Sequence, residues 1–174
     1  MKNGKKLLSI REICIFAVFG ALMFSSKLIM EILPNIHLLG MLVMLCTVLF
    51  RWKALFPIYV YVMINGIYSG FAMWWIPYLY VWTVLFGMTM LIPRKIPDKI
   101  AAVVYPIVCA LHGFSFGILY APAQALMYGL DFEGLVAWVA MGFSFDITHG
   151  ISNFFMGMLV LPLAKTMKKA FPFI

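Results

Sequence analysis

The chain has 174 residues, of which 65% are hydrophobic, 17% aromatic and only 11% charged, and its net charge is +7. A soluble domain carries roughly 45–50% apolar and about 25% charged residues, so one small globule cannot bury this apolar excess. The composition excludes a soluble enzyme, a nucleic-acid-binding domain and a separate extramembrane catalytic domain. It predicts an all-α polytopic membrane protein, with residues 1–174 forming a single integral membrane domain.

Apolar runs, separated by charged residues or by proline and glycine, predict six transmembrane helices. A membrane span needs about 20 mostly apolar residues. The first run carries Lys27 and Glu31 and continues to Leu33, which indicates a retained span rather than a cleaved signal peptide. The predicted spans cover about residues 12–33, 36–50, 54–73, 75–93, 100–121 and 136–164.

The basic residues set the predicted orientation of the chain. Twelve of the thirteen Lys and Arg residues lie before the first span or directly after the second, fourth and sixth spans. With six spans, all twelve fall on one side of the membrane, which the positive-inside rule identifies as the cytoplasm. Both termini are therefore expected to be cytoplasmic, and the net charge needs no nucleic-acid partner.

Two familiar enzyme signatures are absent from the sequence. It contains no GxxxxGK[ST] loop and no HExxH pattern. Cys14, Cys46 and Cys109 lie far apart in apolar runs, as buried structural thiols do. We expect no cofactor, no metal and no catalytic residues.

Polar residues at membrane depth are costly and often functional. Asp146, His149 and Asn153 follow an i, i+3, i+7 spacing and therefore share one face of the predicted sixth span. One interpretation is a cavity-lining stripe, in which Asp146 accepts a cationic or N–H group and three glycines allow close approach. The other is an Asp–His pair that satisfies itself and holds helices together. We favour the cavity. The glycines are Gly142, Gly150 and Gly157.

Other polar groups allow two interpretations each. His112, midway along the fifth span, and Asn65, in the third, either contact a ligand or bond between helices, and we favour the structural role. Gln124 either contacts a ligand or caps its loop. Lys27 and Glu31 are spaced i, i+4, which favours an ion pair over a substrate contact.

Aromatic residues are dense at the start of the fourth span. Tryptophan and tyrosine at a span end usually anchor at the lipid headgroups, but the density here also indicates a stacking wall for a planar ligand. Trp75, Tyr78 and Trp82 share a face, and Tyr120 ends the fifth span on the same predicted outer side. The cluster comprises Trp74, Trp75, Tyr78, Tyr80 and Trp82.

The first span contains Ala17-Val18-Phe19-Gly20-Ala21, in which Ala17 and Ala21 lie one above the other. Such small-xxx-small patterns let another helix pack closely in a membrane. Its position in the cytoplasmic half is compatible with docking of a partner.

Six spans, both ends inside, basic cytoplasmic turns and Ala-x-x-x-Ala in the first span together resemble one family. The chain looks like the substrate-binding membrane subunit, or S component, of energy-coupling factor (ECF) vitamin transporters. The resemblance covers the whole chain as architecture. The stretches Pro34-Asn35-Ile36-His37-Leu38-Leu39-Gly40 and Trp75-Ile76-Pro77-Tyr78 are also similar to those of uncharacterised members.

The resemblance implies a subunit without its own ATPase that captures a vitamin outside a bacterial plasma membrane. A transmembrane coupling subunit and two cytoplasmic ATPase subunits would be its partners, and Ala17 and Ala21 would face the coupling subunit. Toppling in the bilayer would deliver the substrate, and residues 73–76 and 122–134 would act as the lid. Metal-binding members begin with an N-terminal histidine, whereas this chain begins Met1-Lys2-Asn3.

The aromatic wall and Asp146 favour a nitrogen-containing aromatic ring, such as a thiamin- or pyridoxine-like compound. The expected substrate-binding residues come from the polar stripe, the aromatic wall and the fifth span. They are Trp75, Tyr78, Trp82, His112, Tyr120, Gln124, Asp146, His149 and Asn153.

Three other functions remain open from the sequence. Asp146 and His149 would serve as a proton relay in an autonomous secondary transporter, or as acid and base in an intramembrane enzyme acting on a lipid. In a structural subunit, the polar stripe would only pack helices.

Overall fold

The computed structural model describes residues 8–33 and 36–171, and within them it is helical with no β-strand, which confirms the all-α prediction. Two short 3-10 helices, η1 and η2, interrupt the α-helices. In chain order the elements are α1 (Ile10–Ile29), α2 (Leu39–Phe50), η1 (Arg51–Ala54), α3 (Leu55–Ser69), η2 (Met73–Trp75), α4 (Tyr78–Met90), α5 (Asp98–Phe114), α6 (Phe116–Tyr128), α7 (Phe132–Gly157) and α8 (Val160–Ala170).

Four helical stretches of the described chain are long and apolar enough to cross a membrane: Ile10–Ile29, Leu39–Ser69, Asp98–Tyr128 and Phe132–Ala170. The α4 helix is not among them because its 13 residues, at 1.5 Å rise each, cover about 20 Å of a roughly 30 Å hydrocarbon layer. By length and composition, these helices are consistent with a membrane protein. The count of six spans and the orientation of the termini stay predictions.

Two of the expected spans are divided in the structure. The run predicted at 100–121 consists of α5 and α6, which meet at Ser115. The run predicted at 136–164 consists of α7 and α8, with Met158 and Leu159 between them. The run predicted at 75–93 begins with η2, and α4 starts only after Pro77.

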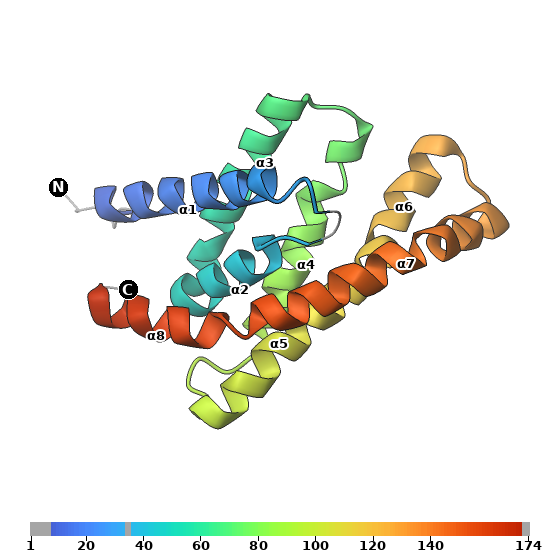
Figure 1. Ribbon diagram of the computed structural model, residues 1–174. Helices are drawn as coiled ribbons and strands as arrows, with labels where there is room; N and C mark the ends of the chain where they lie inside the picture. Colours follow the sequence, from blue (N-terminus) through green and yellow to red (C-terminus); the bar gives the residue numbers. More distant parts are fainter. Residues whose placement is uncertain (1–7, 34–35, 172–174) are drawn as a thin grey trace.

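The two ends of the described chain lie at the same side of the molecule. Figure 1 shows α1 beginning and α8 ending at the left, whereas the hairpin of α6 and the first half of α7 projects to the right. The α5 and α7 helices lie against each other where a Cβ on Gly113 would come within 2.8 Å of the backbone of Gly150. Glycine at these positions lets the two helices approach closely.

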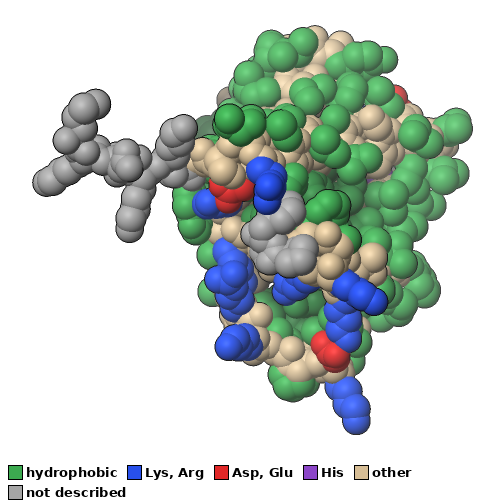
Figure 2. All heavy atoms as spheres, turned by 90° about the vertical axis from the view of Figure 1, so that its left-hand side faces the viewer, with side chains coloured by type: hydrophobic (Ala, Val, Ile, Leu, Met, Phe, Trp, Pro, Cys, Tyr) green, Lys and Arg blue, Asp and Glu red, His purple; other side chains and the backbone are tan. Residues whose placement is uncertain are grey.

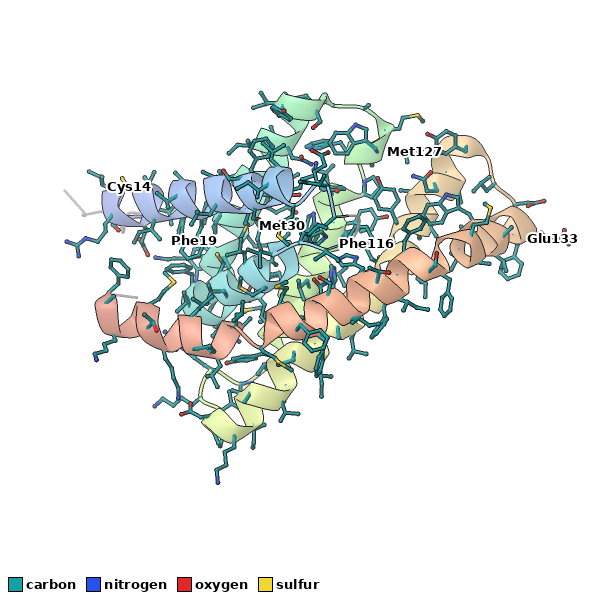
Figure 3. All side chains as sticks on the ribbon, viewed as in Figure 1. Cys14, Phe19, Met30, Phe116, Met127 and Glu133 are labelled. Atoms are coloured by element: carbon teal, nitrogen blue, oxygen red, sulfur yellow. The ribbon has the colours of Figure 1, made fainter. Side chains whose placement is uncertain are left out.

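The α2 helix lies at the centre of the bundle, and nine of its 12 residues are buried. Figure 3 shows Phe19 pointing from α1 toward α2, where its ring packs at 5.8 Å from that of Phe50, while Cys14 points away from the bundle. A helix that is apolar on all sides is typical of such a buried position. The α2 helix packs against α1, α3, α4, α5, α7 and α8.

Arg51 forms the corner between α2 and α3. Its backbone has a positive φ of 54°, and its guanidinium donates hydrogen bonds to the carbonyl oxygens of Met90 (2.8 Å) and Ile92 (3.2 Å) at the end of α4. A basic side chain at these last carbonyls satisfies acceptors that the helix leaves unpaired. Lys53 forms an ion pair with Glu12 near the start of α1.

Figure 2 shows the face at the left of Figure 1, and Lys and Arg side chains gather there. The face brings together the connections that follow α2 and α4 and the end of α8. This gathering agrees with the sequence pattern, because basic clusters far apart in the chain meet at one end of the molecule.

Candidate functional site

Trp82 of α4 is 1% exposed and lies at the centre of a group of aromatic rings that we call the ring cluster. Its ring centroid lies 5.6 Å from that of His112 and 5.7 Å from that of Phe116. Figure 3 shows Phe116 in the middle of the molecule, between α4 and α7. The ring cluster consists of His37, Tyr61, Tyr78, Trp82, His112, Phe116, Tyr120 and His149.

The three histidines of the chain all belong to the ring cluster. The ring centroids of His37 and His149 lie 4.7 Å apart, and Phe116 lies 4.9 Å from His149. These residues come from the α1–α2 connection, the start of α6 and the middle of α7. Histidines scattered over 113 positions of sequence would not meet unless the fold brought these elements together.

Five ring-cluster residues carry a buried nitrogen or oxygen that has no hydrogen-bond partner among the described residues. Buried polar groups in proteins are paired in the large majority of cases, so such atoms call for an explanation. Their concentration on one cluster makes it the candidate site for a polar ligand. The atoms are His37 Nδ1, Tyr61 Oη, Trp82 Nε1, His112 Nδ1 and His149 Nε2.

For two of these atoms, the role as hydrogen-bond donor or acceptor is defined. His112 Nε2 lies 3.0 Å from the carbonyl oxygen of Val81, and because a carbonyl only accepts, Nε2 carries the proton. In the neutral imidazole, His112 Nδ1 is then an acceptor. Trp82 Nε1 is always a donor. A ligand that satisfies both atoms presents one donor and one acceptor.

Asn153 lies one turn after His149 on α7 and is a further buried polar group. Its side chain is fully buried, and neither its Oδ1 nor its Nδ2 has a hydrogen-bond partner in the described part of the chain. It lies against α2, where a Cβ on Gly40 would come within 3.0 Å of the amide. Ser152 Oγ is a further buried atom without a partner there.

Asp146 has a different position from the one expected of a ligand contact. Its two carboxylate oxygens accept the backbone N–H of Gly117, at 3.0 and 3.1 Å, at the start of α6. A carboxylate at a helix N-terminus is stabilised by the unpaired N–H groups and the helix dipole. No hydrogen bond or ion pair joins Asp146 to His149 in the described residues. The alternative interpretation, an Asp–His pair that satisfies itself, is therefore wrong.

The predicted aromatic wall is divided between two roles. Tyr78 contacts Trp82, with ring centroids 5.9 Å apart, and belongs to the ring cluster. Trp75 lies on η2 instead, and its Nε1 donates to the carbonyl oxygen of Val62 at 2.8 Å. The expected shared face of Trp75, Tyr78 and Trp82 fails because α4 begins only at Tyr78.

Tyr120 continues the rings toward the α6–α7 hairpin. Its ring stacks on that of Trp138 at 6.2 Å with an interplanar angle of 12°, and its hydroxyl donates to the carbonyl oxygen of Trp74. Gln124 lies one turn further along α6, is half-buried and forms no hydrogen bond with another described residue.

Lys27 does not pair with Glu31, contrary to expectation. Its Nζ donates to Asn65 Oδ1 at 2.9 Å and lies 6.0 Å from the ring centroid of Trp74. The bond joins α1 to α3, so Lys27 and Asn65 connect helices as Asn65 was expected to do. Of the three glycines predicted to accompany the polar stripe, Gly150 and Gly157 are in close contact with α5, whereas Gly142 faces open space.

Ala17 and Ala21 are both exposed on α1, which packs on α3 through Gly20. The small-residue strip is therefore open to another chain or to lipid. The described residues contain no group of three or more His, Cys, Asp and Glu side chains that could hold a metal ion.

Sequence reasoning missed His37, Tyr61 and Phe116 as members of the site. His37 precedes α2 and lies on no periodic face, and its neighbourhood depends on how the connection after α1 folds. The sequence offered one signal that His37 belongs to the site: it is one of only three histidines in the chain.

Comparison of the chain with protein-family models, with curated proteins and with solved structures finds no match.

Proposed function

We propose that the chain is the substrate-binding membrane subunit of an ATP-driven ECF-type importer, and that the ring cluster holds its substrate. The observation that carries the proposal is the set of five unpartnered buried polar atoms on one group of rings. A packed structural core would leave such atoms paired. A pocket for a planar, hydrogen-bonding ligand requires both rings and free polar groups.

The charges near the ring cluster favour an uncharged substrate. Asp146 is engaged by Gly117 and Lys27 is engaged by Asn65, so these two membrane-depth charges bond outside the cluster. A buried cation or anion without a partner charge would be costly to bind. The substrate we propose is a neutral nitrogen-containing aromatic ring with donors and acceptors along its edge, rather than a thiamin-like cation.

The position of Asp146 supports the importer over two alternatives, a proton-coupled transporter and an intramembrane enzyme. Both need Asp146 as a proton acceptor beside His149, and the carboxylate instead binds the start of α6. Delivery and energy would come from a coupling subunit and two ATPases, with the exposed Ala17–Ala21 strip as the contact. The setting we propose is a bacterial plasma membrane.

Thermal unfolding of the purified chain against B vitamins and their precursors tests the proposal. A ligand that binds only the folded state stabilises it by about 2.7 kcal/mol at one hundred times its Kd. Nicotinamide, nicotinate and 1-methylnicotinamide form a matched set of one ring in neutral, anionic and cationic forms. We expect neutral rings to stabilise the chain, and the anionic and cationic forms to have little effect.

His149→Ala should abolish the stabilisation by the ligand found in that panel. Thr148→Ala is the matched control, because Thr148 is the exposed neighbour of His149 on α7 and its hydroxyl donates to the carbonyl oxygen of Ser144 on the same helix. Equal ligand shifts in both variants, or a silent panel with folded protein, would contradict the proposed function. Binding of charged forms alone would contradict only the neutral substrate.

The partner prediction concerns the strip on α1. Ala21→Leu should reduce copurification of the coupling subunit and ATPases from native membranes at least about tenfold, because the added side chain separates closely packed helices. Ala102→Leu makes the same change at an exposed position of α5. Ligand binding by the isolated subunit should be unchanged in both variants. Equal recovery of the complex would contradict the assignment of the strip.

A further inference from the structure

A basic hollow of about 480 Å³ lies where the α4–α5 connection meets α8. Four cationic side chains and one carboxylate line it: Arg94, Lys95, Lys165, Lys168 and Asp98. Lys165 forms an ion pair with Asp98, whereas the other three cations have no carboxylate partner in the part of the chain that the structure describes. The hollow is thus left with an excess of positive charge.

The inner wall of the hollow adds an uncharged donor. Tyr105 of α5 lines the same space and is 6% exposed. Its hydroxyl forms no hydrogen bond with another described residue, so it can donate to an acceptor inside the hollow. Cations on the rim and a hydroxyl on the wall together suit a phosphate group.

A second hollow, of about 580 Å³, adjoins the first and is almost entirely apolar. The two share Lys95, Ile96 and Pro97 as lining residues. The second hollow continues along the outer side of α5, where Ile100 is 51% exposed. A ligand that fills both hollows therefore has an anionic end and an apolar tail.

The position of the two hollows agrees with such a ligand. They lie at the face where Lys and Arg side chains gather (Figure 2), beside the exposed apolar side of α5. Basic residues at membrane surfaces attract anionic lipid, and basic pockets between helices bind lipid head groups. An acyl chain of a lipid bound by these basic residues would enter the adjoining apolar hollow.

We propose that these hollows form one binding site for an anionic phospholipid. Arg94, Lys95 and Lys168 hold the phosphate, with Tyr105 as a further donor. One acyl chain lies along Ile100, Val104 and Val108 of α5. The site is separate from the ring cluster, so it stands whether or not the ring cluster binds a substrate.

Native mass spectrometry of the full chain tests this site after reconstitution in vesicles of equal parts phosphatidylglycerol and phosphatidylcholine. We expect retained phosphatidylglycerol to exceed phosphatidylcholine at least about tenfold, since each basic residue near the surface contributes about fivefold. The Arg94→Gln/Lys168→Gln variant should lose that preference. The Lys99→Gln/Lys169→Gln variant removes the same charge outside both hollows and should retain it.

The apolar hollow has its own pair of variants. Ile100→Asn should weaken retention of phosphatidylglycerol, whereas Val103→Asn, at an exposed position of α5 outside the hollow, should not. Free inorganic phosphate should fail to displace the lipid. Equal retention of both lipids, equal loss in the two charge variants, or displacement by phosphate would overturn the proposal. Equal behaviour of Ile100→Asn and Val103→Asn would exclude the acyl position.

Discussion

At single residues of the ring cluster, the unpartnered buried atoms lower folding stability but are available to bind a ligand. A buried polar group without a partner costs about 1–3 kcal/mol of folding stability. Natural proteins accept such costs where function requires them. His149 shows the conflict clearly, because it is 2% exposed, its Nε2 has no partner among the described residues, and its ring lies between those of His37 and Phe116.

His149→Phe should separate the two effects. The phenyl ring fills the same space without a buried nitrogen, so we expect the free energy of unfolding to stay equal or rise by about 1–3 kcal/mol. Ligand binding should be lost. Chemical unfolding in detergent and the ligand-dependent thermal shift measure the two quantities on the same sample. Destabilisation together with retained binding would contradict a ligand role for this side chain.

At the residue scale, the sequence predicted the site where helical spacing carried the signal. His149 and Asn153 share a face of α7, and Trp82 and Tyr78 share α4, so both pairs could be predicted. His37 could not be placed, because its contact with His149 depends on the connection after α1 rather than on a periodic pattern. Asp146 fits the same helical spacing, yet its partner is a backbone N–H of another helix, which no side-chain pattern indicates.

At the scale of elements, the junction of α5 and α6 is a consequence of one carboxylate. The apolar run across Ser115 contains Gly113 and Gly117, and helices kink at such glycine and serine positions. The bond from Gly117 to Asp146 shows why α6 can begin there. A Cβ on Gly117 would lie 2.3 Å from Asp146 Oδ2, so glycine is needed at that position. The apolar runs predicted where helices occur, while tertiary contacts decided where they divide.

Asp146→Ala should therefore destabilise the fold without changing the chemistry of transport. Loss of a hydrogen bond to a charged group costs about 1.5–3 kcal/mol, and we expect a loss in this range on chemical unfolding. Asp131→Ala removes an exposed cap of α7, the bond from Gly134 at 2.8 Å, and should cost about 1 kcal/mol.

Uptake by Asp146→Ala, corrected for the amount of folded protein, should keep its affinity and its pH dependence. A loss of proton dependence in this variant, with normal stability, would instead support the proton-relay alternative.

At the scale of the whole molecule, the basic face and the two ends of the described chain lie on the same side. The connections after α2 and α4 and the end of α8 meet at the face seen in Figure 2. The sequence predicted this gathering from charge alone, because the positive-inside rule acts on every connection. It could not predict that α2 would be enclosed by the other helices, since a run of apolar residues faces lipid or protein equally well.

Cysteine labelling should decide the six-span topology. In a chain whose native cysteines are replaced by alanine, Lys95→Cys and Lys169→Cys should react with a membrane-impermeant maleimide only after the cells are permeabilised. Ala72→Cys and Tyr128→Cys, both at exposed positions, should react in intact cells. Labelling of either lysine position together with Ala72→Cys in intact cells would contradict six spans.

Trp82 also gives the molecule an internal optical reporter. Its indole is enclosed by other rings and its N–H is unengaged within the described chain, so a ligand that accepts this proton should shift and quench its fluorescence. Trp52 lies on η1, 49% exposed, and contacts Lys53 rather than the ring cluster, so its emission should stay constant. Occupancy could then be followed by light alone, without a label.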